Sequence, residues 1–213
     1  GPMIEAALTA GLCSAGAQVV SLGVLPSPGI SYVVRSLQAT FGVVVSASHN
    51  PYEDNGVKFF SAAGEKIPDP LEIQIEERLA DPPQIDRPLT GKAVGTVRTV
   101  ADPGRCYLEF LRSTFPYASL APLRIGLDCA HGAASFLAAT LFQELGAQVY
   151  VWHAEPDGSN INHACGSQHP DLLRHKVLAE QLDIGFAFDG DADRLLAIDH
   201  LGQEIDGDHI LAI

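Results

Sequence analysis

The sequence predicts two consecutive three-layer α/β/α domains whose sheets are mixed and mostly parallel. Short apolar and β-branched runs alternate with longer segments of helical periodicity, which is the pattern of strand–helix–strand crossovers with helices on both faces of a sheet. A single proline-rich stretch interrupts this pattern, which then restarts. Of the 213 residues, 46% are hydrophobic and 18% are charged, so the chain can fill packed cores and is not intrinsically disordered.

The first part of the chain alternates helix and strand signals. Residues 3–16 place apolar side chains on one face at 3.6-residue spacing, which predicts a helix, and residues 18–22 form a β-branched strand run. A serine–proline pair at a typical helix start predicts a second helix over about 27–39. The apolar runs at 42–46 and 57–61 predict two further strands.

The pattern continues to the break and restarts beyond it. A polar helix is predicted over 71–79, and the three prolines within 81–88 predict an irregular connector at a domain edge. A helix follows over about 103–115, then a strand over 124–129 and a helix over 133–145 that a glycine closes.

The C-terminal part repeats the alternation. Residues 148–152 predict a strand and 170–181 a helix. Two more strands are predicted at 184–188 and 195–199, separated by an acidic loop. Because this spacing requires crossover connections, the strands are expected to form a mostly parallel sheet with helices on both faces.

Charge and cysteine usage exclude several classes of protein. The 26 acidic residues outnumber the 13 basic ones and give a net charge of −13, which argues against a nucleic-acid partner. No apolar run approaches the ~18–20 residues of a membrane span, and the first residues lack the pattern of a signal peptide. The four cysteines form no C-x-x-C pair, and with no membrane contact expected, a reducing cytoplasm is predicted.

Three carboxylates two residues apart, Asp189, Asp191 and Asp193, directly follow a predicted strand. Ligands gather at the carboxyl ends of strands in open α/β sheets, and three close carboxylates repel one another unless they are solvated or bind a cation. The spacing is not that of a calcium-binding EF-hand loop, because Arg194 and His200 stand where that loop needs glycine and glutamate. The sequence therefore predicts a site for a hard divalent cation such as Mg²⁺, with a solvated acidic turn as the plainer alternative.

A second loop, at residues 46–51 (SASHNP), also follows a predicted strand. Its asparagine–proline pair is a common turn signal, yet a serine such as Ser48 on a constrained loop suits a nucleophile or a phosphate carrier. Lys58, a lone cation in the next apolar strand, is either a side chain that reaches solvent or a group that pairs with phosphate or moves a proton. A Ser-His-Asp hydrolase using His49 is disfavoured, because adjacent serine and histidine do not normally reach each other and no G-x-S-x-G elbow is present.

The two loops together resemble the α-D-phosphohexomutase superfamily. The resemblance rests on SASHNPYEDNGVKFF at 46–60 and DGDADR at 189–194, and it extends over essentially the whole chain. The DNG form at 54–56, with CGS at 165–167 and DGD at 206–208, is most similar to the phosphoglucosamine mutase branch.

The resemblance implies roles for the loop residues. Ser48 would carry a phosphoryl group, and Asp189, Asp191 and Asp193 would hold one Mg²⁺ against that phosphoserine. Arg194 would contact the phosphate. Such a site suits phosphoryl transfer, which needs positioning and neutralisation of charge.

Two further residues receive roles from the same resemblance. Lys58 would assist proton transfer at the sugar hydroxyl, and His49 would help to shape the site. The implied reaction interconverts glucosamine 6-phosphate and glucosamine 1-phosphate through a sugar 1,6-bisphosphate, for amino-sugar nucleotide and cell-wall precursor synthesis. The implied partner is a small hexosamine phosphate, and a homodimer is left open.

The resemblance also implies that this chain is a fragment of a four-domain enzyme. Residues 1–94 would form an incomplete first domain, 95–203 the second, and 204–213 the start of a third. Without the N-terminal segment and the third and fourth domains, turnover by this chain alone is not expected. Three alternatives stay open at this point: a mannose- or glucose-phosphate mutase, a non-catalytic fragment that binds Mg²⁺ and phosphate, and a phosphatase-like hydrolase using the acidic loop alone.

Overall fold

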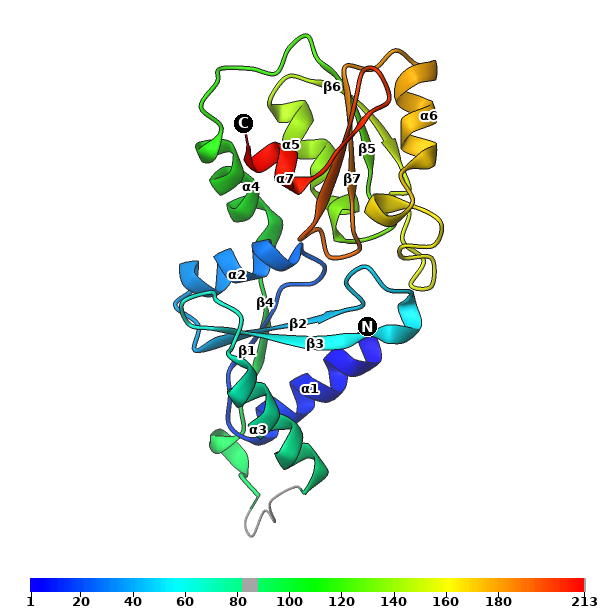
Figure 1. Cartoon of the computed structure of the whole chain (residues 1–213). Coiled ribbons are helices and arrows are strands. Elements are labelled where there is room, and N and C mark those ends of the chain that lie inside the picture. Colours follow the sequence, from blue (N-terminus) through cyan, green and yellow to red (C-terminus); the bar gives the residue numbers. More distant parts are fainter. Residues whose placement is uncertain (82–87, 213) are drawn as a thin grey trace. The chain divides into compact units, whose positions relative to one another are not determined.

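The computed structural model describes residues 1–81 and 88–212, which fold into two compact units (Figure 1). The first unit consists of Gly1–Gly23, Ile30–Val45 and Val57–Pro103. The second consists of Val24–Gly29, Ser46–Gly56 and Gly104–Ile213. Two loops from the first half of the sequence therefore belong to the second unit, while the predicted boundaries after residues 94 and 203 stay predictions.

The first unit contains two small sheets. β1 (Val19–Ser21) pairs in parallel with β4 (Val97–Thr99), and β2 (Phe41–Ser46) pairs with β3 (Gly56–Ser61). β4 is not predicted from the sequence, because all three of its residues are exposed and carry no apolar run. The predicted helices are present as α1, α2 and α3, although no residue of α1 is buried. Their bounds are Pro2–Ser14 for α1, Ser27–Ser36 for α2 and Asp69–Ala80 for α3, with short 3₁₀ helices at Tyr52–Asp54 and Gly91–Ala93.

The predicted proline-rich connector at 81–88 falls mostly on residues 82–87, which lie outside the described residues. Within the ranges that the structure does describe, no helix has both the length and the hydropathy that a membrane span requires.

The second unit is built on one mixed five-stranded sheet in the order β6-β5-β7-β8-β9. β5 (Arg124–Asp128) pairs in parallel with β6 (Gln148–Trp152) and with β7 (Ile184–Phe188). β8 (Leu195–Asp199) is antiparallel to β7, and β9 (Glu204–Ile205) is antiparallel to β8. The predicted strands at 124–129, 148–152, 184–188 and 195–199 are therefore confirmed.

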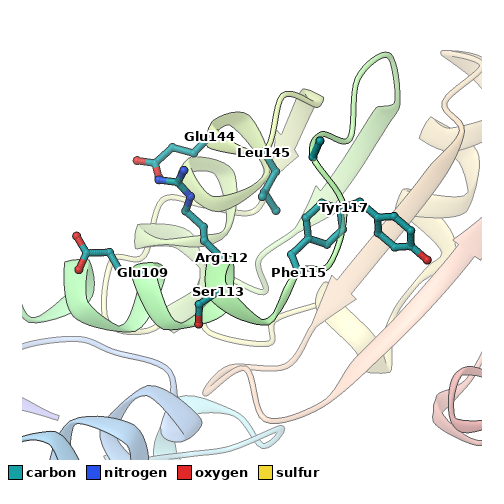
Figure 2. Close-up of a pocket in the computed structure, with 8 residues that line it drawn as sticks. Glu109, Arg112, Ser113, Phe115, Tyr117, Glu144 and Leu145 are labelled. Carbon is teal, nitrogen blue, oxygen red and sulfur yellow. The ribbon is translucent and has the colours of Figure 1, made fainter.

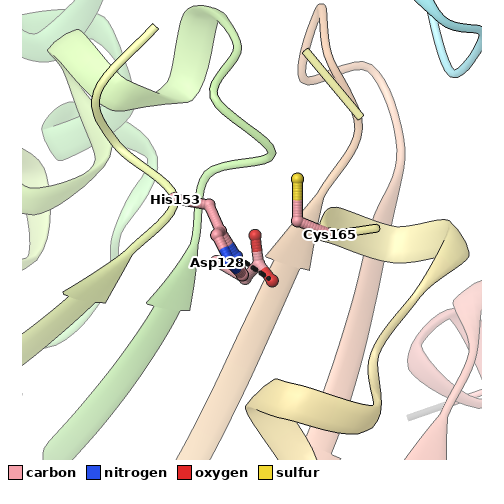
Figure 3. Close-up of side chains that lie close together, drawn as sticks. All are labelled: Asp128, His153 and Cys165. Carbon is pink, nitrogen blue, oxygen red and sulfur yellow. Dashed lines mark hydrogen bonds and ion pairs between the residues drawn. The ribbon is translucent and has the colours of Figure 1, made fainter. Parts of the chain in front are cut away.

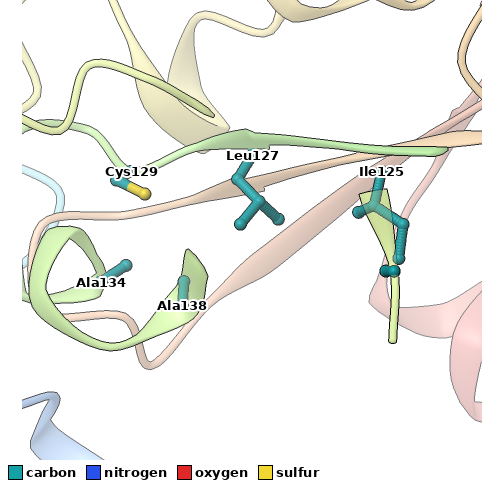
Figure 4. Close-up of a cluster of buried hydrophobic side chains, with 6 residues drawn as sticks. Ile125, Leu127, Cys129, Ala134 and Ala138 are labelled. Carbon is teal, nitrogen blue, oxygen red and sulfur yellow. The ribbon is translucent and has the colours of Figure 1, made fainter. Parts of the chain in front are cut away.

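One face of this sheet is covered by the segment that follows β5. Alternate residues of β5 and its end, Ile125, Leu127 and Cys129, are at most 1% exposed and pack against Ala134 and Ala138 (Figure 4). Because successive strand side chains point to opposite faces, this alternation places the cluster on a single face.

The opposite face is covered by α6 (Asp171–Ala179), through Leu173 and Val177. On β5 and β7, Gly126 and Gly185 alternate with the residues that point to the first face, so they belong to the face that α6 covers. A Cβ on either glycine would come within 3.2 Å of the Leu173 side chain, and α6 therefore packs closely against the sheet. Helix, sheet and helix thus form the three layers that the sequence predicts for this half of the chain.

The helix predicted over 133–145 is wrong as a single element. A 3₁₀ helix spans Ala133–Phe136, the backbone breaks at Leu137 with φ −128°, and α5 covers only Ala138–Glu144. The apolar periodicity of the segment continues across the break, so it gave no sign of the interruption.

α4 (Pro103–Thr114) is joined to the end of α5 by ion pairs. Glu144 accepts from Arg105 at 2.7 Å and from Arg112 at 3.0 Å, all three side chains being partly exposed. A pocket of about 350 Å³ lies beside these pairs, between α4, the segment after it and α5 (Figure 2). Two short elements complete the unit, a 3₁₀ helix at Gly166–Gln168 and α7 at Gly207–Leu211.

Candidate functional site

The acidic loop directly follows β7, at the carboxyl end of a parallel strand. Asp189 is 0% and Asp191 3% exposed, whereas Asp193 is exposed. One carboxylate oxygen from each of the three lies within 4.8 Å of the others. The structure therefore brings together the three carboxylates that the sequence singled out.

Asp189 is held by the backbone of its own loop. Its Oδ1 accepts the backbone N–H of Asp193 at 3.2 Å and that of Arg194 at 3.1 Å. Its Oδ2 is buried, and no group in the described part of the chain hydrogen-bonds it. Because a buried, unsatisfied carboxylate oxygen is costly, this atom fits a ligand for a hard cation.

The charge of the cluster is poorly compensated within the chain. Burial, followed by the negative charges of Asp191 and Asp193, raises the pKa of Asp189 from 3.8 to about 6, although the backbone N–H of Arg194 acts in the opposite direction. A divalent cation among the three oxygens would remove this penalty. The donor set, three carboxylates with oxygen ligands only, suits Mg²⁺.

The stability of the metal-free chain is expected to report this raised pKa. Asp189 contributes stability that is present below its ordinary pKa and is lost as the pH rises through about 6. The variant Asp189→Asn cannot ionise, and its amide oxygen can still accept the same two N–H groups. Its free energy of unfolding in a chelator, measured with urea, should therefore rise relative to wild type between about pH 4 and about pH 7. A difference that does not change with pH would contradict the assignment.

Asp191 is fixed by a residue from the first half of the sequence, Ser27. The Ser27 hydroxyl donates to Asp191 Oδ2 at 2.5 Å, and its backbone N–H donates to the Asp191 carbonyl at 2.9 Å. Ser27 is 3% exposed, so solvent does not compete for these bonds. From the sequence, Ser27 is predicted only to begin a helix, because nothing in its local pattern indicates a partner 164 residues away.

The loop that carries Ser48 lies against the acidic loop in the same compact unit. Ser48 itself is half-buried and has a φ of 54°, and its backbone N–H donates to the Ser46 hydroxyl at 2.8 Å. The side-chain amide of Asn162 donates to the carbonyls of both Ser48 and Asn50, at 2.8 Å each. The side-chain amide of Asn162, which lies more than 100 residues further along the chain, thus holds the Ser48 turn in place.

The two loops meet at Gly190. A Cβ at this position would lie 2.5 Å from the Ser48 carbonyl oxygen and 2.8 Å from the Asn162 side-chain nitrogen. Only a glycine permits such an approach, and the backbone of Ser48 therefore sits directly on the loop of the three carboxylates. Asn162 is another site residue that the sequence does not single out, since an asparagine in a polar loop is typical of an ordinary turn.

The other three predicted site residues, Arg194, His49 and Lys58, differ in exposure and position. Arg194 is exposed at the end of the acidic loop, and His49 is half-buried with a buried Nδ1 that has no hydrogen-bond partner among the described residues. Lys58 lies half-buried on β3 in the first unit. The roles of these three residues stay predictions.

Family models and similar proteins both relate this chain to one family of enzymes. Residues 1–85 match the family model described as phosphoglucomutase/phosphomannomutase, alpha/beta/alpha domain I, and residues 105–202 match domain II of the same family. The whole chain is 51% identical to a phosphoglucosamine mutase of Deinococcus deserti and 50% identical to one of Pseudomonas fluorescens. It spans 48% and 47% of these relatives, about half of their length.

A solved structure shares the fold of the chain. The phosphoglucomutase/phosphomannomutase family protein of Burkholderia thailandensis superposes with a TM-score of 0.77 and 31% sequence identity. The match covers 96% of this chain and 45% of that protein.

Proposed function

Because the chain belongs to the phosphoglucomutase/phosphomannomutase family, we propose that it is the phosphoserine- and magnesium-bearing part of a phosphoglucosamine mutase. One observation carries the proposal: the Ser48 turn and the three carboxylates belong to one compact unit and touch at Gly190. A phosphate carrier beside a cation site is the arrangement that phosphoryl transfer needs. The reaction would interconvert glucosamine 6-phosphate and glucosamine 1-phosphate.

Ser48 is the proposed phosphate carrier. Its positive φ and the Asn162 amide bonds to its carbonyl and to that of Asn50 fix the turn before any substrate binds. A carrier that is already oriented loses little conformational entropy on reaction. In the forward step the Ser48 Oγ–P bond would break while a bond forms between phosphorus and a sugar hydroxyl, which gives a sugar 1,6-bisphosphate. Ser48 would regain its phosphoryl group from the other position of the sugar.

Asp189, Asp191 and Asp193 would hold Mg²⁺ beside the phosphoserine. When bound, the cation supplies charge neutralisation on the transferring phosphoryl oxygens. The chain's own contribution is to hold the carboxylates in place. Two backbone N–H groups donate to the Asp189 carboxylate, and the Ser27 hydroxyl donates to that of Asp191.

Two basic side chains complete the proposed chemistry. Arg194, exposed at the end of the acidic loop, would pair with phosphate oxygens, and its guanidinium suits two parallel hydrogen bonds to one phosphate. Lys58, in its neutral amine form, would take the proton that the sugar hydroxyl loses as it bonds to phosphorus, and would return it in the reverse step.

The hexosamine substrate is supported by the relatives, since the proteins about 50% identical to this chain are phosphoglucosamine mutases. A mannose- or glucose-phosphate mutase of the same family is the alternative. Because the chain spans about half of those relatives, we propose that it holds the phosphoryl carrier but does not complete turnover alone. The predicted cytoplasmic location and homodimer are not needed for this proposal.

Intact-mass spectrometry tests the proposal directly. The chain is incubated with Mg²⁺ and glucose 1,6-bisphosphate, and we expect the mass of one phosphoryl group to be retained on wild type and absent from Ser48→Ala. The variant Ser46→Ala, which removes the other loop serine and with it the hydroxyl that accepts the Ser48 N–H, should still acquire the group, although more slowly. A wild-type chain that stays unmodified, or a phosphoryl group found on Ser46, would contradict the proposal. Release of free phosphate without retention would instead support the hydrolase.

A further inference from the structure

A second cluster of side chains, which the proposed reaction does not use, lies at the same edge of the sheet as the acidic loop (Figure 3). Asp128 ends β5, His153 follows β6, and Cys165 immediately precedes the 3₁₀ helix Gly166–Gln168. One potential ligand atom from each residue lies within 4.8 Å of the other two. Carboxylate, imidazole and thiol together form a mixed donor set, unlike the three carboxylates of the first site.

Asp128 gives this cluster a buried negative charge. Its side chain is 1% exposed, with Oδ1 accepting the Ala130 N–H at 3.0 Å and Oδ2 lying 3.0 Å from His153 Nδ1. Because an ionised carboxylate can only accept, Nδ1 carries the hydrogen in this contact. A buried carboxylate held by two N–H donors is still an environment that attracts a cation.

Cys165 is a buried thiol beside that carboxylate, with 1% exposure. Burial, followed by the negative charge of Asp128, raises the pKa of the thiol to about 12, so without a cation it stays protonated and is a poor nucleophile. A reactive or redox cysteine is therefore not what this position provides. A bound divalent cation reverses the electrostatics, because it lowers the pKa of a coordinating thiol enough to deprotonate it.

We propose that Asp128, His153 and Cys165 bind Zn²⁺, or a divalent transition metal of the same ligand preference, at a site separate from the three-carboxylate site. Thiolate, imidazole and carboxylate are the ligand types that Zn²⁺ takes in proteins. The cation would enter between Nδ1 and Oδ2 in place of the hydrogen bond. The ring hydrogen would move from Nδ1 to Nε2, the thiol proton would pass to solvent, and three metal–ligand bonds would form.

The donor atoms lie near the spacing that this step requires and would have to draw together around the cation. Ligand atoms around tetrahedral zinc lie at ~2.0–2.3 Å from the metal, and therefore roughly 3.3–3.7 Å from one another. The Nδ1–Oδ2 contact of 3.0 Å is slightly shorter than that, and the 4.8 Å limit that holds for one ligand atom from each residue is about 1 Å longer than the upper value of that range. The His153 side chain is 22% exposed, so the cluster lies close to solvent on that side. Three protein ligands leave a fourth position for water.

The site adjoins the loop of the proposed Mg²⁺ ligands. A Cβ on Gly166, the residue after Cys165, would lie 2.5 Å from the carbonyl oxygen of Phe188, the residue before Asp189. Any test must therefore distinguish the two sites by ligand chemistry. Sulfur does so, because the acidic loop contains none.

Cobalt spectroscopy of the 213-residue chain provides that test. Added Co²⁺ should give a near-ultraviolet thiolate-to-cobalt charge-transfer band, and Zn²⁺ should displace it. The band should disappear in Cys165→Ser and persist in Cys129→Ser, which changes another thiol of 1% exposure with a pKa raised to about 12 by burial. Asp191→Asn should leave the band intact. No band in wild type, a band that survives Cys165→Ser, or one lost in Asp191→Asn would each overturn the proposal.

A second measurement covers the case in which the serine variants fold poorly. X-ray absorption at the zinc edge of the zinc-loaded wild-type chain should show one sulfur together with nitrogen and oxygen ligands. A shell of only nitrogen and oxygen would overturn the proposal. Zinc affinity should also fall by ~10- to 100-fold or more in His153→Gln, since losing even an indirect partner of a metal ligand costs that much.

Discussion

Replacing Asp191 by asparagine is expected to weaken Mg²⁺ binding to the chain by on the order of 100-fold, because it removes one of three negative charges at the cation. The change is close to isosteric. The asparagine side-chain oxygen can still accept the Ser27 hydroxyl, and the carbonyl still accepts the Ser27 N–H, so the loop should keep its position. Isothermal titration calorimetry with MgCl₂ on wild type and variant measures the difference.

The same substitution should not destabilise the metal-free chain. Asp191 is the second cause, after burial, of the raised pKa of Asp189, so removing its charge relieves repulsion at neutral pH. Asp171→Asn is the matched control, because that side chain is 90% exposed and pairs only with Arg174 among the contacts described for it. Its Mg²⁺ affinity should equal that of wild type. Wild-type Mg²⁺ affinity in Asp191→Asn would contradict the ligand assignment.

The main strands of the second unit could be predicted because each has a plain signature, a short and mostly apolar run next to a turn or helix signal. β5 is buried along most of its length, and Ile125 and Leu127 give it the apolar character that is typical of such a strand, although Arg124 begins it and Asp128 ends it. The exposed strand β4 carries no such signature, because its place is determined by backbone pairing with β1 across 78 residues of sequence. The break at Leu137 is similar, since the apolar periodicity runs across it without interruption.

The candidate site also contains residues that the sequence predicts and residues that it does not. The carboxylates at 189, 191 and 193 are close in sequence, so their chemistry is visible without a structure. The residues that hold them and the Ser48 turn in place act through single hydrogen bonds from distant segments. Ser27 and Asn162 are ordinary turn and cap residues in sequence, and only the fold shows that they bond to Asp191 and to the Ser48 carbonyl. The Asp128–His153 contact, across 25 residues, was invisible for the same reason.

Gly190→Ala is expected to separate the Ser48 turn from the carboxylates. The added Cβ would lie 2.5 Å from the Ser48 carbonyl oxygen, which is backbone and cannot rotate away. The acidic loop cannot shift away from Ser48 either, because it is packed on its other side. The Gly190 carbonyl accepts the Ala133 N–H at 2.8 Å, and on that side even a Cβ on Gly132 would come within 2.2 Å of it.

The expected cost is therefore a loss of ~1–3 kcal/mol in the free energy of unfolding, as is typical of overpacking. Phosphorylation of Ser48 should fall by roughly 100-fold, because a displacement of about 1 Å at a reacting group costs that much. Gly207→Ala is the matched control: no atom lies within 4 Å of its added Cβ, at the first residue of α7, so it should be neutral or slightly stabilising. Urea unfolding gives the first quantity and intact mass over time the second. If Gly190→Ala keeps the wild-type free energy of unfolding and the wild-type phosphorylation rate, the close approach of the two loops does not determine the site. If phosphorylation is lost while stability is retained, the substitution acts through the position of Ser48 alone.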